Sequence, residues 1–106
     1  DIELLRGTTD AHYLETVSQT LDYLIRLHQP DLIIYDAGVD IHTDDNLGYL
    51  DISTDGIFNR DKEVIQQAKS AQIPIACVIG GGYSNSIDLL NIRHSQLFLA
   101  ANTVHC

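Results

Sequence analysis

The sequence predicts an α/β fold in which helices cover both faces of a parallel sheet. Segments with helical periodicity alternate with short apolar runs, and each apolar run is followed by a loop rich in Asp or Gly. The order is helix, strand, helix, strand, helix, and strands connected through a helix run parallel with a right-handed crossover. An apolar fraction of 44% and a charged fraction of 20% are ordinary for a globular domain.

The first helix and the first strand are expected in residues 10–35. Apolar residues recur at helical spacing after Thr9 or Asp10, either of which can cap the helix, and Pro30 ends it. The run from Leu32 to Tyr35 has no polar alternation. Such a run is typical of a parallel strand that is buried on both faces.

A second helix is expected after residues 53–55, which can cap it, with Asp61 interrupting its apolar face. The run from Ile75 to Ile79 predicts a second buried strand, and Gly80–Gly82 ends it. The third helix, capped within residues 84–86, has a predicted apolar face of Ile87, Leu90, His94, Leu97, Phe98 and Ala101. On this face we expect His94 to be a core histidine bonded to backbone.

Composition excludes several classes of protein. The net charge is −9 and the basic residues are scattered, which argues against nucleic-acid binding. No apolar run approaches the roughly 20 residues that span a membrane, and no secretion signal is visible. Cys77 lies in an apolar stretch and is expected to be a buried, reduced thiol, whereas Cys106 is terminal and expected to be exposed. These features favour a cytoplasmic location.

Residues 1–106 read as a single unit, without a linker or a repeat. Two strands alone leave both edges of a sheet open. The chain also begins at Asp1 and contains no methionine. We therefore expect further strands upstream of this sequence.

Ligands in open α/β sheets bind beyond the carboxyl ends of the strands. After the first strand, Asp40 and His42 form an Asp-x-His pair, and carboxylate and imidazole are zinc ligands. The alternative is that acidic residues there only form turns and caps, with His42 an exposed loop histidine.

The loop after the second strand carries three glycines and then Tyr83. It lacks the lysine of a phosphate-binding P-loop, and Asn85 stands where the third glycine of a dinucleotide fingerprint would fall. A glycine run instead lets the backbone pass close to a bulky group. The ordinary alternative for Tyr83 is a loop tyrosine that half-packs on the third helix.

Two groups of motifs raise a specific resemblance. Residues 35–40, 45–48 and 50–53 resemble a hallmark stretch of the histone deacetylase superfamily, and Gly56-Ile57 and Arg60-Asp61 continue the match, particularly towards class IV and bacterial members. Residues 78–83 are similar to the second C-terminal hallmark of that family. The resemblance implies the C-terminal portion of an arginase–deacetylase fold, and a zinc ion held by two aspartates and one histidine.

By the same resemblance, Asp40 is a zinc ligand, Tyr83 assists the zinc, and Gly81 and Gly82 line the tunnel for the acyl-lysine. His42 falls at a variable position. The remaining ligands and the paired histidines that handle the proton come earlier in the family and have no counterpart here. The resemblance therefore implies that this piece is inactive without the rest of the deacetylase domain. Asn46 and Asp44 depart from the Arg and Gly of many members, which leaves the subfamily and the preferred acyl chain open.

The implied function is hydrolysis of acetyl or other acyl groups from lysine-like amines. Zinc would activate water, and Tyr83 would stabilise the oxyanion. One alternative is an amidohydrolase that acts on acetylpolyamines or other small amides. An alternative of another class is a non-catalytic, flavodoxin-like module whose glycine loop binds an anion.

Overall fold

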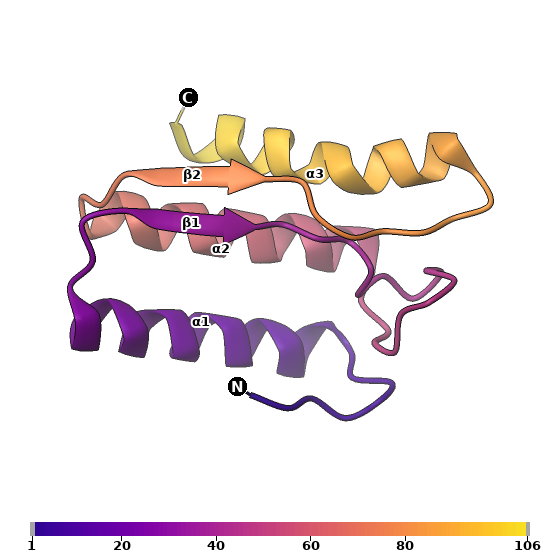
Figure 1. Cartoon of the computed structure of the whole chain (residues 1–106), viewed down its shortest axis with the longest axis horizontal. Coiled ribbons are helices and arrows are strands. Elements are labelled where there is room, and N and C mark those ends of the chain that lie inside the picture. Colours follow the sequence, from indigo (N-terminus) through magenta and orange to yellow (C-terminus); the bar gives the residue numbers. More distant parts are fainter. Residues whose placement is uncertain (1, 106) are drawn as a thin grey trace.

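The computed structural model describes residues 2–105, in which the predicted order of elements is present (Figure 1). These elements are α1 (Asp10–His28), β1 (Ile33–Asp36), α2 (Thr54–Ser70), β2 (Ile75–Val78) and α3 (Ile87–His105). The start of α2 follows the predicted cap, because the Ser53 side chain accepts a hydrogen bond from the Gly56 N–H at 2.9 Å.

The two strands pair in parallel, with Ile33 opposite Ile75 and Asp36 opposite Val78. The crossover helix α2 lies behind the strands in Figure 1, and both α1 and α3 pack against α2. The molecule therefore has one layer of helices and one layer of sheet. This arrangement confirms the predicted α/β class with a parallel sheet.

The second face of the sheet differs from the sequence-based expectation. Burial alternates along both strands, and the Ile34 and Val78 side chains are 73% and 49% exposed. The right-handed crossover puts α2 on one face, and the other helices follow α2 to the same side. Within residues 2–105, the strands are thus covered on one face only, and the prediction that both faces are buried is not met by these residues.

Two apolar clusters form the core. One combines Ala37 with residues of α2 and α3, namely Ile65, Leu97, Ala100 and Val104. The other consists of Val39, Ile52 and Ile57. Ala37 and Val39 belong to the loop that leaves β1, so the core anchors the beginning of that loop directly.

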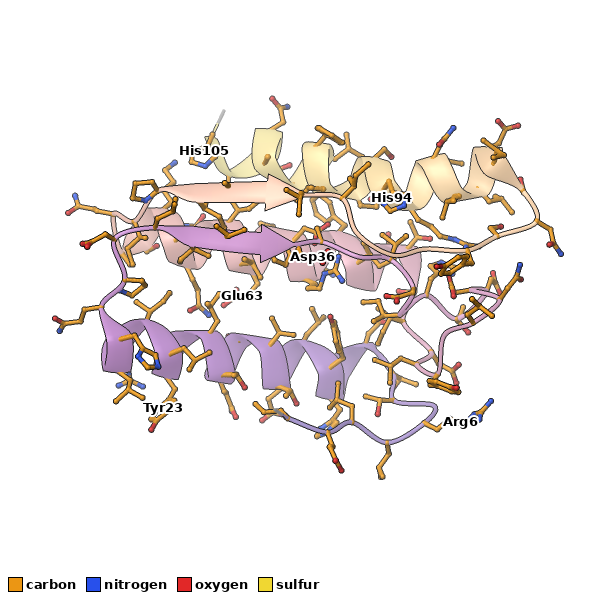
Figure 2. The ribbon with its side chains drawn as sticks, viewed as in Figure 1. Arg6, Tyr23, Asp36, Glu63, His94 and His105 are labelled. Carbon is orange, nitrogen blue, oxygen red and sulfur yellow. The ribbon has the colours of Figure 1, made fainter. Side chains whose placement is uncertain are left out.

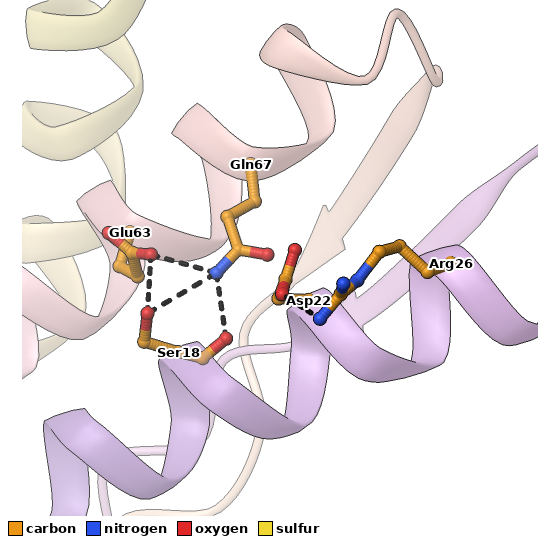
Figure 3. Close-up of polar contacts among 5 residues, drawn as sticks. All are labelled: Ser18, Asp22, Arg26, Glu63 and Gln67. Atoms are coloured by element: carbon orange, nitrogen blue, oxygen red, sulfur yellow. Dashed lines mark hydrogen bonds and ion pairs between the residues drawn. The ribbon is translucent and has the colours of Figure 1, made fainter.

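Polar contacts join α1 to α2, and no residue of α1 is fully buried. Ser18 donates a hydrogen bond to Glu63 at 2.9 Å, and Gln67 donates to Glu63 at 2.8 Å and to the Ser18 carbonyl at 2.9 Å (Figure 3). The nearby pair of Asp22 and Arg26 is exposed and lies within α1. Exposed pairs of this kind contribute little to stability.

The buried face of α3 is rotated from the predicted one. Ile87 and Phe98 are 70% and 67% exposed, whereas Arg93, Leu97, Ala100 and Val104 are buried. Packing against α2 selects this face, and apolar periodicity alone misplaced it.

His94 is half-buried and lies between α3 and the segment that follows β2 (Figure 2). Its Nδ1 atom is buried without a hydrogen-bond partner among the described residues. The prediction that His94 is bonded to backbone is therefore wrong for this part of the chain.

Cys77 is only half-buried and is a free thiol, and burial raises its pKa. Cys106, predicted to be exposed, lies outside the described residues. Across residues 2–105, none of the helices has both the length and the apolar character needed to span a bilayer.

Candidate metal-binding and catalytic site

Two loops meet beyond the carboxyl ends of the strands, as the parallel pairing predicts. We call residues 37–52 the acidic loop and residues 79–86 the glycine loop. The Ala37 N–H donates to the Val78 carbonyl at 2.8 Å, and the Val39 N–H donates to the Gly81 carbonyl at 2.6 Å. The short ladder between the strands thus continues into the two loops and fixes them side by side.

Asp40 is exposed and lies against the glycine loop. A Cβ added at Gly81 would stand 2.9 Å from Asp40 Oδ2, so a side chain at that position would collide with the carboxylate. Because Gly81 has no side chain, the Asp40 carboxylate has room beside it and stays open to solvent. A carboxylate in this position is able to provide an oxygen ligand to a metal ion.

His42 does not share this situation. It is buried, its Nδ1 accepts from the Asp44 N–H at 3.0 Å, and its Nε2 lies 3.0 Å from Thr54 Oγ1. Burial, followed by the nearby charge of Arg93, lowers the pKa of His42. Because Nδ1 accepts from the Asp44 N–H, the ring proton belongs on Nε2, which then donates to Thr54 Oγ1. The expectation of an exposed loop histidine is wrong, because the turn after Asp40 folds the ring inward.

A structural role for His42 leads to a prediction about stability. His42→Ala should lower the free energy of unfolding by about 1–3 kcal/mol, because it removes a buried ring that accepts from the Asp44 N–H and contacts Thr54. Urea denaturation measures this change, with the exposed Thr43→Ala as the matched control. Equal midpoints for the two variants would show that the His42 hydrogen bonds contribute nothing.

A buried cluster of Arg60, Asp61 and Tyr35 contacts the backbone of the acidic loop at Gly38. Arg60 donates to the Gly38 carbonyl at 2.7 Å and through its Nε to Asp61 at 2.9 Å. The Tyr35 hydroxyl donates to the same oxygen of Asp61, and burial raises the pKa of Tyr35, so this phenol stays protonated. Asp61, an anomaly on the predicted apolar face of its helix, is thus the partner of Arg60.

Loss of Arg60 should be costly. Arg60 and Asp61 are 4% and 1% exposed, and removal of one partner leaves a buried charge uncompensated. Arg60→Ala is expected to destabilise the protein by about 3–5 kcal/mol. Lys62→Ala removes an exposed positive charge from the same helix and serves as the control in denaturant unfolding. A loss for Arg60→Ala as small as that of Lys62→Ala would refute this account of the cluster.

Tyr83 follows the glycines and is 51% exposed, so its phenol is accessible. Its N–H donates to Asp45 Oδ1 at 2.6 Å, and its carbonyl accepts from the Asn46 N–H at 3.3 Å. The structure therefore brings the loops of Asp40 and Tyr83 together. Sequence reasoning did not single out the contact with Asp45.

The two predicted tunnel glycines have different surroundings. Gly81 is exposed beside Asp40, whereas a Cβ at Gly82 would lie 2.6 Å from Val39 Cγ2 and 3.2 Å from His94 Nε2. Gly82 is thus required by the packing of this chain itself. That either glycine lines a substrate tunnel remains a prediction.

Asp40 provides one candidate ligand, and residues 2–105 contain no group of three or more His, Cys, Asp or Glu side chains able to hold a metal ion. Catalytic zinc sites typically use three protein ligands. Asp40 fits a metal as a single oxygen donor, but the described residues do not form a complete zinc site.

The chain is thus an open α/β sheet with an exposed carboxylate, that of Asp40, in a loop beyond its carboxyl edge. Among solved structures, the chain is similar to the acetylpolyamine aminohydrolase of Burkholderia pseudomallei. The TM-score is 0.76 at 23% identity, over 98% of this chain and 28% of the other. The fold is the arginase–deacetylase fold.

The family follows from sequence comparison. The family model described as histone deacetylase domain matches residues 1–95. An uncharacterized protein of Picosynechococcus sp. is 42% identical over 99% of this chain and 35% of its own length. Histone deacetylase 2 of Arabidopsis thaliana is 42% identical over 80% of this chain and 22% of its own length. The chain belongs to the histone deacetylase family, and it spans about a third or less of these curated relatives.

Proposed function

We propose that this chain is the C-terminal part of a zinc-dependent deacetylase that hydrolyses acetyl or related acyl groups from lysine-like amines. The observation that carries the proposal is the exposed Asp40 carboxylate beside the glycine loop, at the edge of a histone deacetylase-family sheet. We call this chain together with the remainder of the deacetylase domain the complete domain.

Asp40 would provide one oxygen ligand to zinc, and the remainder of the domain would provide the other ligands. Zinc in such a site polarises the amide carbonyl and lowers the pKa of bound water. Because a single carboxylate does not retain catalytic zinc, residues 1–106 alone should be inactive.

Tyr83 would donate its phenolic proton to the substrate oxygen as that oxygen becomes negative. A donor aimed at developing charge stabilises the transition state more than the ground state. Gly81 and Gly82 would let the backbone border the acyl-lysine closely. The 51% exposure of Tyr83 is compatible with this role, since a phenol sealed in the core would not reach substrate.

The uncovered face of the sheet supports the need for the rest of the domain. Ile34 and Val78 are 73% and 49% exposed and lie on adjoining strands. Exposed apolar side chains on one face of a sheet often mark an interface. We propose that the remaining strands and helices of the deacetylase domain cover it.

Production of residues 1–106 alone and of the complete domain tests the proposal. The complete domain should contain zinc and deacetylate an acetyl-lysine peptide, while residues 1–106 should do neither. Faster hydrolysis of an acetylpolyamine would indicate a small-amide hydrolase. A complete domain without zinc, which instead binds phosphate or a nucleotide, would indicate a non-catalytic module and refute the proposal.

A further inference from the structure

We infer that Asp45 is a positioning residue for Tyr83, assisted by Asn46. The inference rests on the proposed function, because it assigns a role to groups that hold the proposed oxyanion donor. Asp45 acts through the backbone of Tyr83 and has no assigned contact with substrate or metal.

Both oxygens of the Asp45 carboxylate are used. Oδ1 accepts from the Tyr83 N–H at 2.6 Å, and Oδ2 accepts from the Leu47 N–H at 3.0 Å. Hydrogen bonds to an ionised acceptor are short and roughly twice as strong as neutral ones. The Asp45 carboxylate therefore holds the Tyr83 backbone, and the Leu47 N–H of the acidic loop keeps that carboxylate in place.

Asn46 makes two further links between the same loops. Its N–H donates to the Tyr83 carbonyl at 3.3 Å, and its Nδ2 donates to Asn85 Oδ1 at 3.2 Å. Both backbone polar groups of Tyr83 are thus held by consecutive residues of the acidic loop. The same acidic loop carries Asp40, so these hydrogen bonds to Tyr83 fix the position of Tyr83 relative to the candidate ligand Asp40.

The glycine loop needs these hydrogen bonds to hold Tyr83 in one position. Gly80, Gly81 and Gly82 precede Tyr83, and glycine has the largest backbone freedom of any residue. The last hydrogen bond before Tyr83 that ties this loop to the acidic loop is the one from Val39 to Gly81. A misplacement of about 1 Å can cost on the order of 100-fold in rate, so the anchor at Tyr83 itself matters for catalysis.

A double-mutant cycle in the complete domain tests the inference. Asp45→Ala should lower kcat by about 10- to 100-fold, as expected for a misplaced donor, with KM within a few-fold and zinc content unchanged. In the Tyr83→Phe background the same substitution should cost less than about threefold, because the phenol it positions is gone. Asp44→Ala removes the neighbouring exposed carboxylate and should leave turnover near wild type.

Amide hydrogen exchange gives a readout that does not depend on activity. The Tyr83 N–H should exchange faster in Asp45→Ala than in wild type or Asp44→Ala, while amides within α2 stay unchanged. Should Asp45→Ala fail to fold, Asp45→Asn serves in its place. Asparagine keeps one acceptor oxygen, but its NH2 group cannot accept from the amide that the second carboxylate oxygen now holds, so it should be intermediate in exchange and in turnover.

The outcomes distinguish the positioning role of Asp45 from the proposed catalytic role of Tyr83. Losses that multiply in the cycle, with Tyr83→Phe itself slow, would overturn the positioning role and leave the role of Tyr83 in place. Unaltered Tyr83 exchange in both Asp45 variants would also overturn it. A Tyr83→Phe variant as fast as wild type would instead overturn the proposed function of Tyr83.

Discussion

Replacement of Asp40 by alanine in the complete domain should abolish zinc retention and hydrolysis together. Asp40 is exposed in the loop that follows β1 and lies against the bare backbone of Gly81. Loss of a direct ligand should exceed the roughly 10- to 100-fold effects typical of residues that only orient ligands. Elemental analysis after dialysis, alongside steady-state kinetics, measures both quantities.

Asp44→Ala provides the matched control, since it removes a carboxylate of the same loop and the same charge. It should retain zinc and activity. An Asp40→Ala protein with full zinc content and near-normal turnover would remove Asp40 from the metal site.

Tyr83→Phe should slow turnover by roughly 100- to 1,000-fold, the usual loss for one oxyanion donor. The hydroxyl contributes most when the substrate oxygen is negative, so kcat and kcat/KM should fall together while KM stays within a few-fold. Phe keeps the ring, and the hydrogen bonds of the Tyr83 backbone to Asp45 and Asn46 remain. Zinc content and the free energy of unfolding should therefore be unchanged.

A purely structural tyrosine leads to the opposite expectation. Phenylalanine would then be tolerated, and the rate would stay within about threefold of wild type rather than falling as for a transition-state donor. Steady-state kinetics on the zinc-loaded variant distinguish these two cases.

Local signals were sufficient to predict the elements of the fold. Helical periodicity, the Ser53 cap and the two apolar strands define segments that the structure reproduces closely. The face of α3 was not predictable in the same way, because packing against α2 buries Arg93 and leaves Phe98 exposed. Both Asp61 and Arg93 are polar side chains that apolar periodicity cannot place inside.

The site was predictable only in part. The carboxyl ends of parallel strands bring the loops of Asp40 and Tyr83 together, and that followed from the order of elements. The inward turn of His42 and the contact of Arg60 with the Gly38 carbonyl depend on tertiary geometry, and they carry no spacing signal. The hydrogen bond between the Asp45 carboxylate and the Tyr83 N–H joins residues that are far apart in the sequence, so local sequence patterns did not predict it.

The most direct measurement of the central claim is the position of zinc in a crystal of the complete domain, located by anomalous scattering at the zinc edge. The account predicts a zinc peak about 2.0–2.2 Å from an Asp40 carboxylate oxygen, the usual distance for a zinc–carboxylate bond. A zinc peak coordinated entirely by other residues, with the Asp40 carboxylate outside bonding distance, would contradict it.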